Sequence, residues 1–204
     1  MIGVAGGSGA GKTTFCKMIQ VRVASDVFII KHDMYYKDLS HMAPEQRDKQ
    51  NFDHPDAFDN ALFFAHLTLL RQGRGIEVPE YDYVTHTRFR KSVWVKKADT
   101  VLIEGIMLFN EQRIRDLFDY KVFIDVDSDI RFIRRLQRDL DARGRTLPSV
   151  ISQWVSSVKP MHDTHVQTSK KYADLVVSVD DIDEAAAGIV SFITKNKIRH
   201  GNGA

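Results

Sequence analysis

The stretch that decides the fold is Met1-Ile-Gly-Val-Ala-Gly-Gly-Ser-Gly-Ala-Gly-Lys-Thr13, a short apolar run followed by a glycine-rich segment. Residues 1–5 predict a buried strand, and residues 12–24 predict a helix. Between them, residues 6–13 match the pattern G-x-x-x-x-G-K-[ST] at every fixed position. The glycines let successive backbone N–H groups turn inward, where they and the helix N-terminus can hold an anion. The stretch therefore predicts a phosphate-binding loop.

This loop predicts a nucleoside triphosphate as ligand. Lys12 is expected to reach the β- and γ-phosphates, and the Thr13 hydroxyl to hold Mg²⁺. The residues predicted to contact the triphosphate here are Gly6, Gly7, Ser8, Gly9, Ala10, Gly11, Lys12, Thr13 and Thr14. The motif alone does not name a reaction, because motors, switches and kinases all use it.

Outward from the loop, short apolar runs alternate with stretches of helical periodicity, which predicts an α/β fold with a central, parallel, five-stranded sheet flanked by helices. Strands are expected at 1–5, 27–31, 100–104, 120–126 and 175–179. Helices are expected at 12–24, 54–72, 129–142 and 182–196. We expect a single domain over 1–204, with a β-hairpin insert at 75–97, a lid at 139–150 and a flexible tail at 198–204.

The composition is that of an ordinary soluble globular protein. The 204 residues carry 29 basic and 27 acidic side chains, a formal charge of +2 that gives no reason to expect nucleic acid or a membrane as partner. Cys16 is the single cysteine, which fits a reducing compartment. With no charged-then-apolar leader and no long apolar run, we expect neither a signal peptide nor a membrane span, and a cytoplasmic location.

Several residues favour a kinase over a guanine-nucleotide switch. The Asn196-Lys197 pair lacks the aspartate that a switch needs, and the D-x-x-G at 141–144 follows a basic helix instead of a strand. Asp33 follows the strand at 27–31, on the predicted ligand-binding edge, where it can act as general base and contact Mg²⁺. Glu104 ends another strand and can hold Mg²⁺. The alternative for Asp33 is a turn-forming or helix-capping role, and the alternative for Glu104 is a surface position at the end of its strand.

The helix expected at 129–142 has two faces, with Ile133, Leu136 and Leu140 on one and arginines on the other. The arginines are Arg131, Arg135 and Arg138, and the exit loop adds Arg143 and Arg145. Guanidinium groups suit phosphate because their planar fork binds two oxygens at once. We expect an arginine-rich lid in which Arg138, Arg143 and Arg145 bind the triphosphate. A solvated helix face is the alternative, above all for Arg131 and Arg134.

The insert between 33 and 88 is rich in aromatic, acidic and histidine side chains. Phe52, Tyr81 and Tyr83 can stack on a flat ring, Asp53 can accept hydrogen bonds from hydroxyls, and His86 can bond a base edge. This chemistry suits an uncharged nucleoside. The alternative is that the aromatic rings are core and the histidine is structural.

The chain resembles the uridine kinase (uridine–cytidine kinase) family of P-loop kinases over residues 3–179. The segments that carry the resemblance are 51–58 (NFDHPDAF), 81–88 (YDYVTHTR), 104–106 (EGI), 134–139 (RRLQRD), 143–145 (RGR) and 171–174 (KYAD). The resemblance implies that Asp33 is the general base on the nucleoside 5′-hydroxyl, and that Asp53 and Arg135 hold the ribose hydroxyls. It implies pyrimidine contacts for Tyr36, Tyr81 and His86, with Phe52 and Tyr83 flanking the ring and Gln153 nearby. The remaining catalytic residues would be Lys12, Arg138 and Arg143.

The same resemblance implies ATP or GTP as phosphoryl donor, Mg²⁺, a homotetramer, and a role in pyrimidine salvage. The predicted product is the 5′-monophosphate of uridine or cytidine. Two alternatives remain open at this point. One is a phosphoribulokinase-like sugar kinase, which would need a cationic pocket for a phosphorylated acceptor. The other is a nucleotide-sensing protein that has lost turnover.

Overall fold

The computed structural model describes residues 1–24, 26–47 and 49–201. Its strands are β1 (Ile2–Gly6), β2 (Val27–Lys31), β3 (Ile76–Asp82), β4 (Thr87–Val95), β5 (Thr100–Gly105), β6 (Tyr120–Ile124) and β7 (Leu175–Val177). Its longer helices are α1 (Lys12–Arg22), α3 (Asn60–Arg71), α5 (Ser128–Ala142), α6 (Leu147–Gln153) and α9 (Ile182–Gly201). Short helical turns are η1 (His32–Tyr35), α2 (Pro44–Arg47), η2 (Pro55–Ala57) and α4 (Gln112–Arg115). Beyond α6 the chain stays helical through η3 (Trp154–Val158), α7 (Lys159–Met161), η4 (His162–Val166), α8 (Gln167–Ser169) and η5 (Lys170–Tyr172).

Within the described residues, five parallel strands form the central sheet in the order β2-β5-β1-β6-β7. This confirms the predicted fold class. β1 lies in the middle and pairs with β5 on one side and β6 on the other. Because the strands are parallel, the segments that follow β1, β2 and β5 emerge at one edge of the sheet, which is where α/β proteins bind their ligands.

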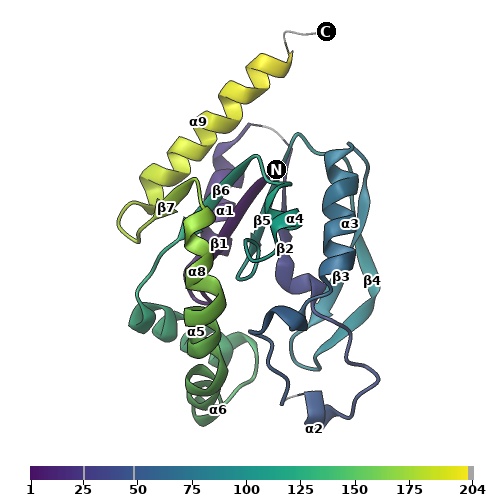
Figure 1. The fold of residues 1–204 in the computed structure, drawn as a ribbon, viewed down its shortest axis with the longest axis vertical. Coiled ribbons are helices and arrows are strands. Elements are labelled where there is room, and N and C mark those ends of the chain that lie inside the picture. Colours follow the sequence, from purple (N-terminus) through teal and green to yellow (C-terminus); the bar gives the residue numbers. More distant parts are fainter. Residues whose placement is uncertain (25, 48, 202–204) are drawn as a thin grey trace.

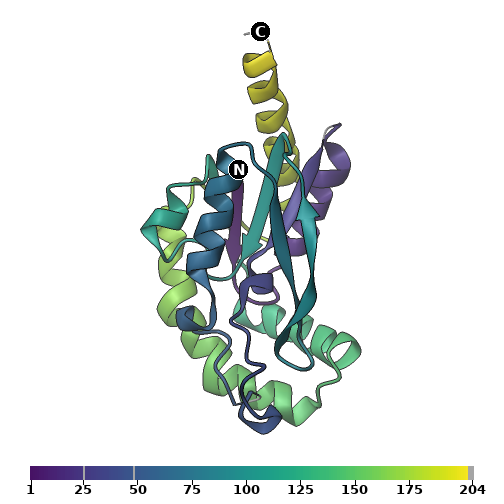
Figure 2. The ribbon, with the colours of Figure 1, turned by 90° about the vertical axis from the view of Figure 1, so that its right-hand side faces the viewer.

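The core lies on both faces of this sheet, as expected for a parallel sheet covered by helices. On one face, Val4 and Leu102 pack against α1 and α9 through residues such as Cys16 and Ile189. The opposite face packs against α3 and the β3–β4 hairpin. Figure 1 shows α3 beside this hairpin, on the far side of the sheet from α9, which extends past the sheet edge in both views (Figures 1 and 2).

The β3–β4 hairpin confirms the expected insert. The helix expected from residue 54 begins later, however, at Asn60. Residues Pro55–Ala57 form a single 3-10 turn, and Phe58 is extended. The side chain of Asp59 accepts a hydrogen bond from Leu62 N (3.1 Å) and so caps α3. The sequence contained this cap, but the apolar periodicity of the preceding residues obscured it.

Helix α5 faces the opposite way from an ordinary amphipathic helix. Its polar residues Arg131, Arg135 and Asp139 are buried, whereas Ile133 and Leu140 are 54% and 39% exposed. The alternative that Arg131 lies on a solvated face is therefore wrong. Its side chain is 3% exposed, donates to Val126 O (2.9 Å) and stacks over the Trp154 ring.

The C-terminal helix continues to Gly201, further than predicted. Of the tail expected at 198–204, residues 202–204 lie outside the described residues. No helix in the described part of the chain combines the length and apolar character needed to cross a bilayer.

Candidate active site

The phosphate loop links the end of β1 to α1 and depends on backbone conformations that side chains resist. Gly9 has φ +81° and Gly11 has φ +93°. A Cβ on Gly9 would also collide with the Arg131 carbonyl oxygen of α5. The loop is closed by a hydrogen bond from Ala10 N to Gly7 O (3.1 Å). Glycine is thus needed at position 9 both for its φ angle and for the close approach of α5.

Lys12 lies at the start of α1, directly after the loop. Its Nζ donates to Gly7 O at 2.8 Å, so the ammonium group reaches back across the loop. Burial lowers the pKa of Lys12, and the negative charges of Glu104 and Asp33 oppose this effect. The side chain is therefore held where the phosphates of a bound nucleotide would meet it.

Thr13 and Glu104 form a pair between α1 and the end of β5. The Thr13 hydroxyl is 2.7 and 2.8 Å from the two carboxylate oxygens of Glu104. Burial raises the pKa of Glu104, while Lys12 and the Thr13 hydrogen bond lower it. The described residues contain no cluster of three or more His, Cys, Asp or Glu side chains that could hold a metal. A hydroxyl and a carboxylate suit Mg²⁺ that is bound jointly with phosphate oxygens.

Two cavities meet at this edge of the sheet. The first, of about 590 Å³, is lined by the phosphate loop, Glu104 and α5. The second, of about 50 Å³, lies between the insert, α5 and α6. Both are lined by Ser8, Asp33, Tyr83, Ile106, Arg138 and Arg143. Asp33, in η1 after β2, therefore stands at the boundary between the loop cavity and the insert cavity.

The insert cavity brings together every residue that the sequence predicted to bind the acceptor. These residues are Asp33, Tyr36, Phe52, Asp53, Tyr81, Tyr83, His86, Arg135 and Gln153. They come from η1, the segment before η2, the hairpin, α5 and α6. Segments far apart in the sequence therefore converge on one space.

The aromatic residues of this cavity pack against each other. Tyr36 and Tyr81 have ring centroids 5.3 Å apart, and Phe52 stacks on His86 at 4.2 Å. His86 has φ +55°, a left-handed conformation that turns the hairpin at this point. These rings are buried and also line the cavity, so their packing in the core does not exclude contact with a ligand.

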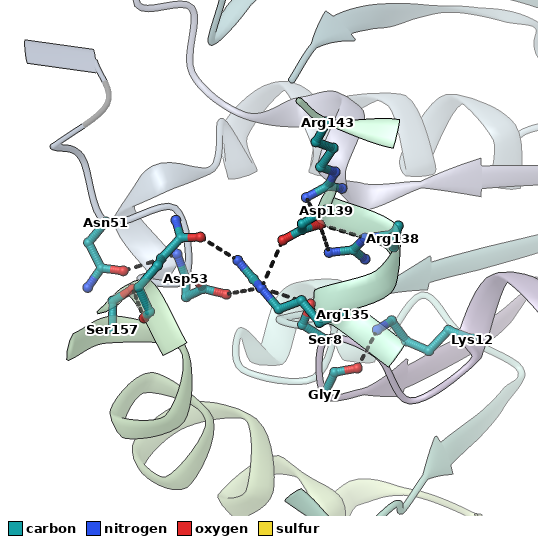
Figure 3. A network of polar contacts seen from close by, with 11 residues as sticks. Gly7, Ser8, Lys12, Asn51, Asp53, Arg135, Arg138, Asp139, Arg143 and Ser157 are labelled. Carbon is teal, nitrogen blue, oxygen red and sulfur yellow. Dashed lines mark hydrogen bonds and ion pairs between the residues drawn. The ribbon is translucent and has the colours of Figure 1, made fainter. Parts of the chain in front are cut away.

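A polar network lies beside the rings and is centred on Arg135 (Figure 3). Arg135 Nη1 donates to Ser8 Oγ (2.9 Å) and lies 3.7 Å from Asp53 Oδ1. Arg135 Nη2 donates to Gln153 Oε1 (2.8 Å). Burial raises the pKa of Asp53, and the charge of Arg135 opposes the increase. The guanidinium group of Arg135 thus contacts the phosphate loop, Asp53 and α6.

The comparisons with known proteins agree on one family. A sequence model of the Phosphoribulokinase / Uridine kinase family matches residues 1–184. The uridine kinase of Brevibacillus brevis is 43% identical over 192 residues, which cover 94% of this chain and 90% of the relative. The uridine kinase of Chloroflexus aurantiacus is 48% identical over 177 residues, with 86% and 85% covered.

This chain belongs to the Phosphoribulokinase / Uridine kinase family. Among solved structures, the phosphoribulokinase of Rhodobacter spheroides has the same fold, with a TM-score of 0.64 at 15% identity. That match covers 87% of this chain and 69% of the phosphoribulokinase. The family's name covers two kinds of kinase, phosphoribulokinases and uridine kinases.

The arginines predicted to form the lid, Arg138, Arg143 and Arg145, all line the insert cavity. Arg138 and Arg143 line both cavities, but Arg145 lines only the insert cavity, where its Nη2 is 3.4 Å from His86 Nε2. Arg143 stacks over the Tyr83 ring at 4.6 Å. Triphosphate contact by Arg145 stays a prediction, and it requires the side chain to move from this position.

One buried carboxylate of this region, Asp139, was not predicted as a site residue from the sequence. Asp139 has no exposed surface and contacts Arg138 and Arg143, although in the sequence it stands out only as part of the segment 134–139. Arg131 packs beneath Gly7 of the phosphate loop. The available signal was spacing, because Asp139 lies four residues after Arg135 and four before Arg143, which places them on one side of a helix.

Proposed function

We propose that this protein transfers the γ-phosphoryl group of ATP or GTP to the 5′-hydroxyl of uridine or cytidine, giving UMP or CMP. The observation that carries the proposal is the position of Asp33 at the boundary between the phosphate-loop cavity and the aromatic, acid-containing insert cavity. A general base has to lie between the phosphoryl donor and the hydroxyl that attacks it, and Asp33 is the carboxylate that lines both cavities. The names of the relatives support the same acceptor.

In the proposed reaction, Asp33 accepts the proton of the 5′-hydroxyl as its oxygen attacks the γ-phosphorus in line. Lys12, Arg138 and Arg143 offset the negative charge that spreads over the phosphoryl oxygens. Asp53 and Arg135 hold the ribose hydroxyls, while Phe52 and Tyr83 flank the base. Such catalysis consists mainly of positioning and electrostatic stabilisation.

Thr13 and Glu104 would hold Mg²⁺, with Asp33 as a further candidate ligand. The ion supplies charge neutralisation and orientation of the triphosphate when it is bound.

The arginines of the insert cavity could also suit an acceptor that already carries a phosphate, as in a sugar-phosphate kinase. Their charges are largely engaged, however. Arg135 pairs with Asp53 and Asp139, and Asp139 also contacts Arg138 and Arg143. An acceptor with two more negative charges would face Asp33 and Asp53 as well. The cavity chemistry therefore favours an uncharged nucleoside.

The insert cavity has to enlarge before a nucleoside can enter. Its volume is about 50 Å³, whereas ligand sites are on the order of 300 Å³ or more. His86 covers one face of Phe52, and the side chains of Arg143 and Arg145 border the same space. We expect acceptor binding to move the lid loop after α5 and the hairpin tip away from each other.

The test is ADP formation from Mg·ATP with a panel of acceptors that contains uridine, cytidine, purine nucleosides and phosphorylated sugars. Turnover with the pyrimidine nucleosides alone supports the proposal. Turnover with a phosphorylated sugar alone would assign the sugar-kinase function, and binding without turnover would assign the sensor.

Asp33→Asn tests the base directly. We expect kcat to fall about 10²- to 10⁴-fold with nucleoside affinity retained. Asp26→Asn is the matched control, because Asp26 lies before the opposite end of β2 and its carboxylate is exposed. Near-normal turnover of Asp33→Asn would refute the assignment of Asp33 as general base.

We also propose a cytoplasmic homotetramer that acts in pyrimidine salvage. Exposed apolar side chains support self-association. They lie on β4, at Phe89, Val93 and Trp94, and on α5 and α6, at Ile133 and Ile151. Light scattering coupled to gel filtration should give four times the chain mass, and a monomer mass at micromolar concentration would overturn the proposal.

A further inference from the structure

Asp139 is a fully buried carboxylate in the last turns of α5, and guanidinium groups surround it (Figure 3). Arg138 reaches its Oδ1 through Nε (2.9 Å) and Nη2 (2.8 Å). Arg143 Nη1 lies 3.5 Å from the same oxygen. Arg135 Nε lies 3.2 Å from the other oxygen, Oδ2. A buried carboxylate is costly unless it is paired, so these contacts account for its presence here.

The two oxygens of Asp139 contact different arginines. Oδ1 contacts Arg138 and Arg143, which line the phosphate-loop cavity and also border the insert cavity. Oδ2 faces Arg135, whose other nitrogens contact Asp53, Gln153 and the loop residue Ser8. One carboxylate therefore touches the arginines assigned to the donor through one oxygen and the arginine assigned to the acceptor through the other.

The two oxygens of Asp139 differ in their hydrogen bonding. The Oδ1 side has an aligned hydrogen bond from Arg138. On the other side, Arg135 Nε and Asp139 Oδ2 are close in space, yet within the described residues neither atom has an aligned hydrogen bond. The contact with Arg135 can consequently improve if the groups on Oδ1 are drawn away.

A bound triphosphate would draw them away. Its oxygens compete with Oδ1 for Arg138 and Arg143, both of which are partly exposed and able to turn. The negative charge of Asp139 would then act mainly on Arg135, and such interactions are strong in a buried setting. Arg135 in turn would be fixed for the ribose hydroxyls next to Asp53.

We propose that Asp139 is a positioning residue that couples the two substrate sites, so that nucleotide binding tightens nucleoside binding. The inference rests on the proposed function for the identity of the two ligands. By linkage, the nucleoside must then tighten nucleotide binding by the same factor.

The experiment is calorimetric titration of uridine into the protein, with and without saturating Mg²⁺ and a non-hydrolysable ATP analogue. In the wild-type protein the analogue should lower the Kd of uridine about fivefold or more, within the usual range of coupling between sites. In Asp139→Asn the ratio of the two Kd values should fall close to one. Asp141→Asn, an exposed aspartate on the same helix, should keep the wild-type ratio.

A purely structural role for Asp139 gives a different result. In that case Asp139→Asn would raise the Kd of uridine equally with and without the nucleotide analogue. The ratio of the two Kd values would then stay at the wild-type value, which would overturn the proposal. A wild-type ratio of one would overturn it as well. If the wild-type protein binds no uridine, the proposed function fails instead, and the coupling is measured with the acceptor that the panel identifies.

Asp139→Asn adds net positive charge to a buried cluster and could prevent folding, so circular dichroism and the melting temperature are checked first. In that case Arg143→Gln is compared with the double variant Asp139→Asn/Arg143→Gln, which restores the net charge of the cluster. Arg143→Gln should keep part of the coupling through Arg138, and the double variant should have none. Equal coupling in these two variants would refute the role of Asp139.

Discussion

Asp53→Asn should weaken nucleoside binding by removing a charged acceptor of hydrogen bonds from the ribose. The carboxylate is 6% exposed and lies 3.7 Å from Arg135, beyond hydrogen-bond distance, so an oxygen remains available to a ligand. Hydrogen bonds to a charged group contribute about 1.5–3 kcal/mol. At 1.4 kcal/mol for each factor of ten, we expect the Kd of uridine to rise about 10- to 100-fold.

The fold should tolerate this substitution. Breaking a buried ion pair costs about 3–5 kcal/mol when it leaves an unpaired charge. Here Arg135 keeps Asp139 at 3.2 Å and its hydrogen bonds to Ser8 and Gln153. The asparagine also has nearly the same volume. We therefore expect a loss of roughly 1 kcal/mol or less in the free energy of unfolding.

The assay compares uridine with 2′,3′-dideoxyuridine by calorimetry, in the wild-type protein and in Asp53→Asn. The wild-type protein should lose affinity for the dideoxy compound, and Asp53→Asn should show a smaller loss, because its hydroxyl contacts no longer include the charged carboxylate. Asp56→Asn, an exposed neighbour in the same segment, serves as the control and should behave like the wild type. An equal dideoxy penalty in the wild-type protein and Asp53→Asn would refute the ribose contact.

Further perturbations test other parts of the site. Lys12→Met removes the cation that bridges the phosphate loop and should lower kcat about 10²- to 10³-fold, while calorimetry without nucleotide shows unchanged uridine affinity. Gly9→Ala places a Cβ against the Arg131 carbonyl at a left-handed φ, so affinity for the ATP analogue should fall at least about tenfold; normal affinity would contradict the loop geometry. Burial, with help from the nearby charge of Arg131, lowers the pKa of His162 from 6.5 to about 4. The unfolded chain therefore takes up a proton that the native state resists, and this residue makes stability fall as the pH drops from 6.5 to 4. In His162→Phe, the free energy of unfolding measured with denaturant should depend less on pH across that range. An unchanged dependence on pH would exclude His162 as its source.

The sheet and the phosphate loop could be predicted because their signals are local. The apolar strands at 27–31 and 100–104 are short and uninterrupted, and the loop pattern specifies its own backbone. The composition of the insert and a family resemblance both indicated that Asp33, Asp53 and His86 share one site. Nothing in their spacing brings these three residues together, since the contact depends on how the insert folds over the sheet.

The start of α3 and the orientation of α5 could not be derived from periodicity. Phe58 continues the apolar face of Leu62 and Leu69, but the Asp59 cap marks a later start for the helix. In α5 the pattern correctly indicates two faces but not which face is buried. Hydrophobicity favours burial of Ile133, whereas the buried side carries Arg135 and Asp139, whose opposite charges lie 3.2 Å apart.

The reversed orientation of α5 has a consequence for anyone who engineers this protein. Scoring schemes that reward burying apolar side chains would retain Ile133 and Leu140 and replace Arg135 and Asp139. In a saturation library of residues 128–142, the isolated chain should accept charged replacements at the two aliphatic positions and reject aliphatic ones at the two charged positions. Along this helix, the apolar positions Ile133 and Leu140 would then tolerate substitution better than the charged positions Arg135 and Asp139. The solubility of the isolated chain could be raised by changing the exposed face alone.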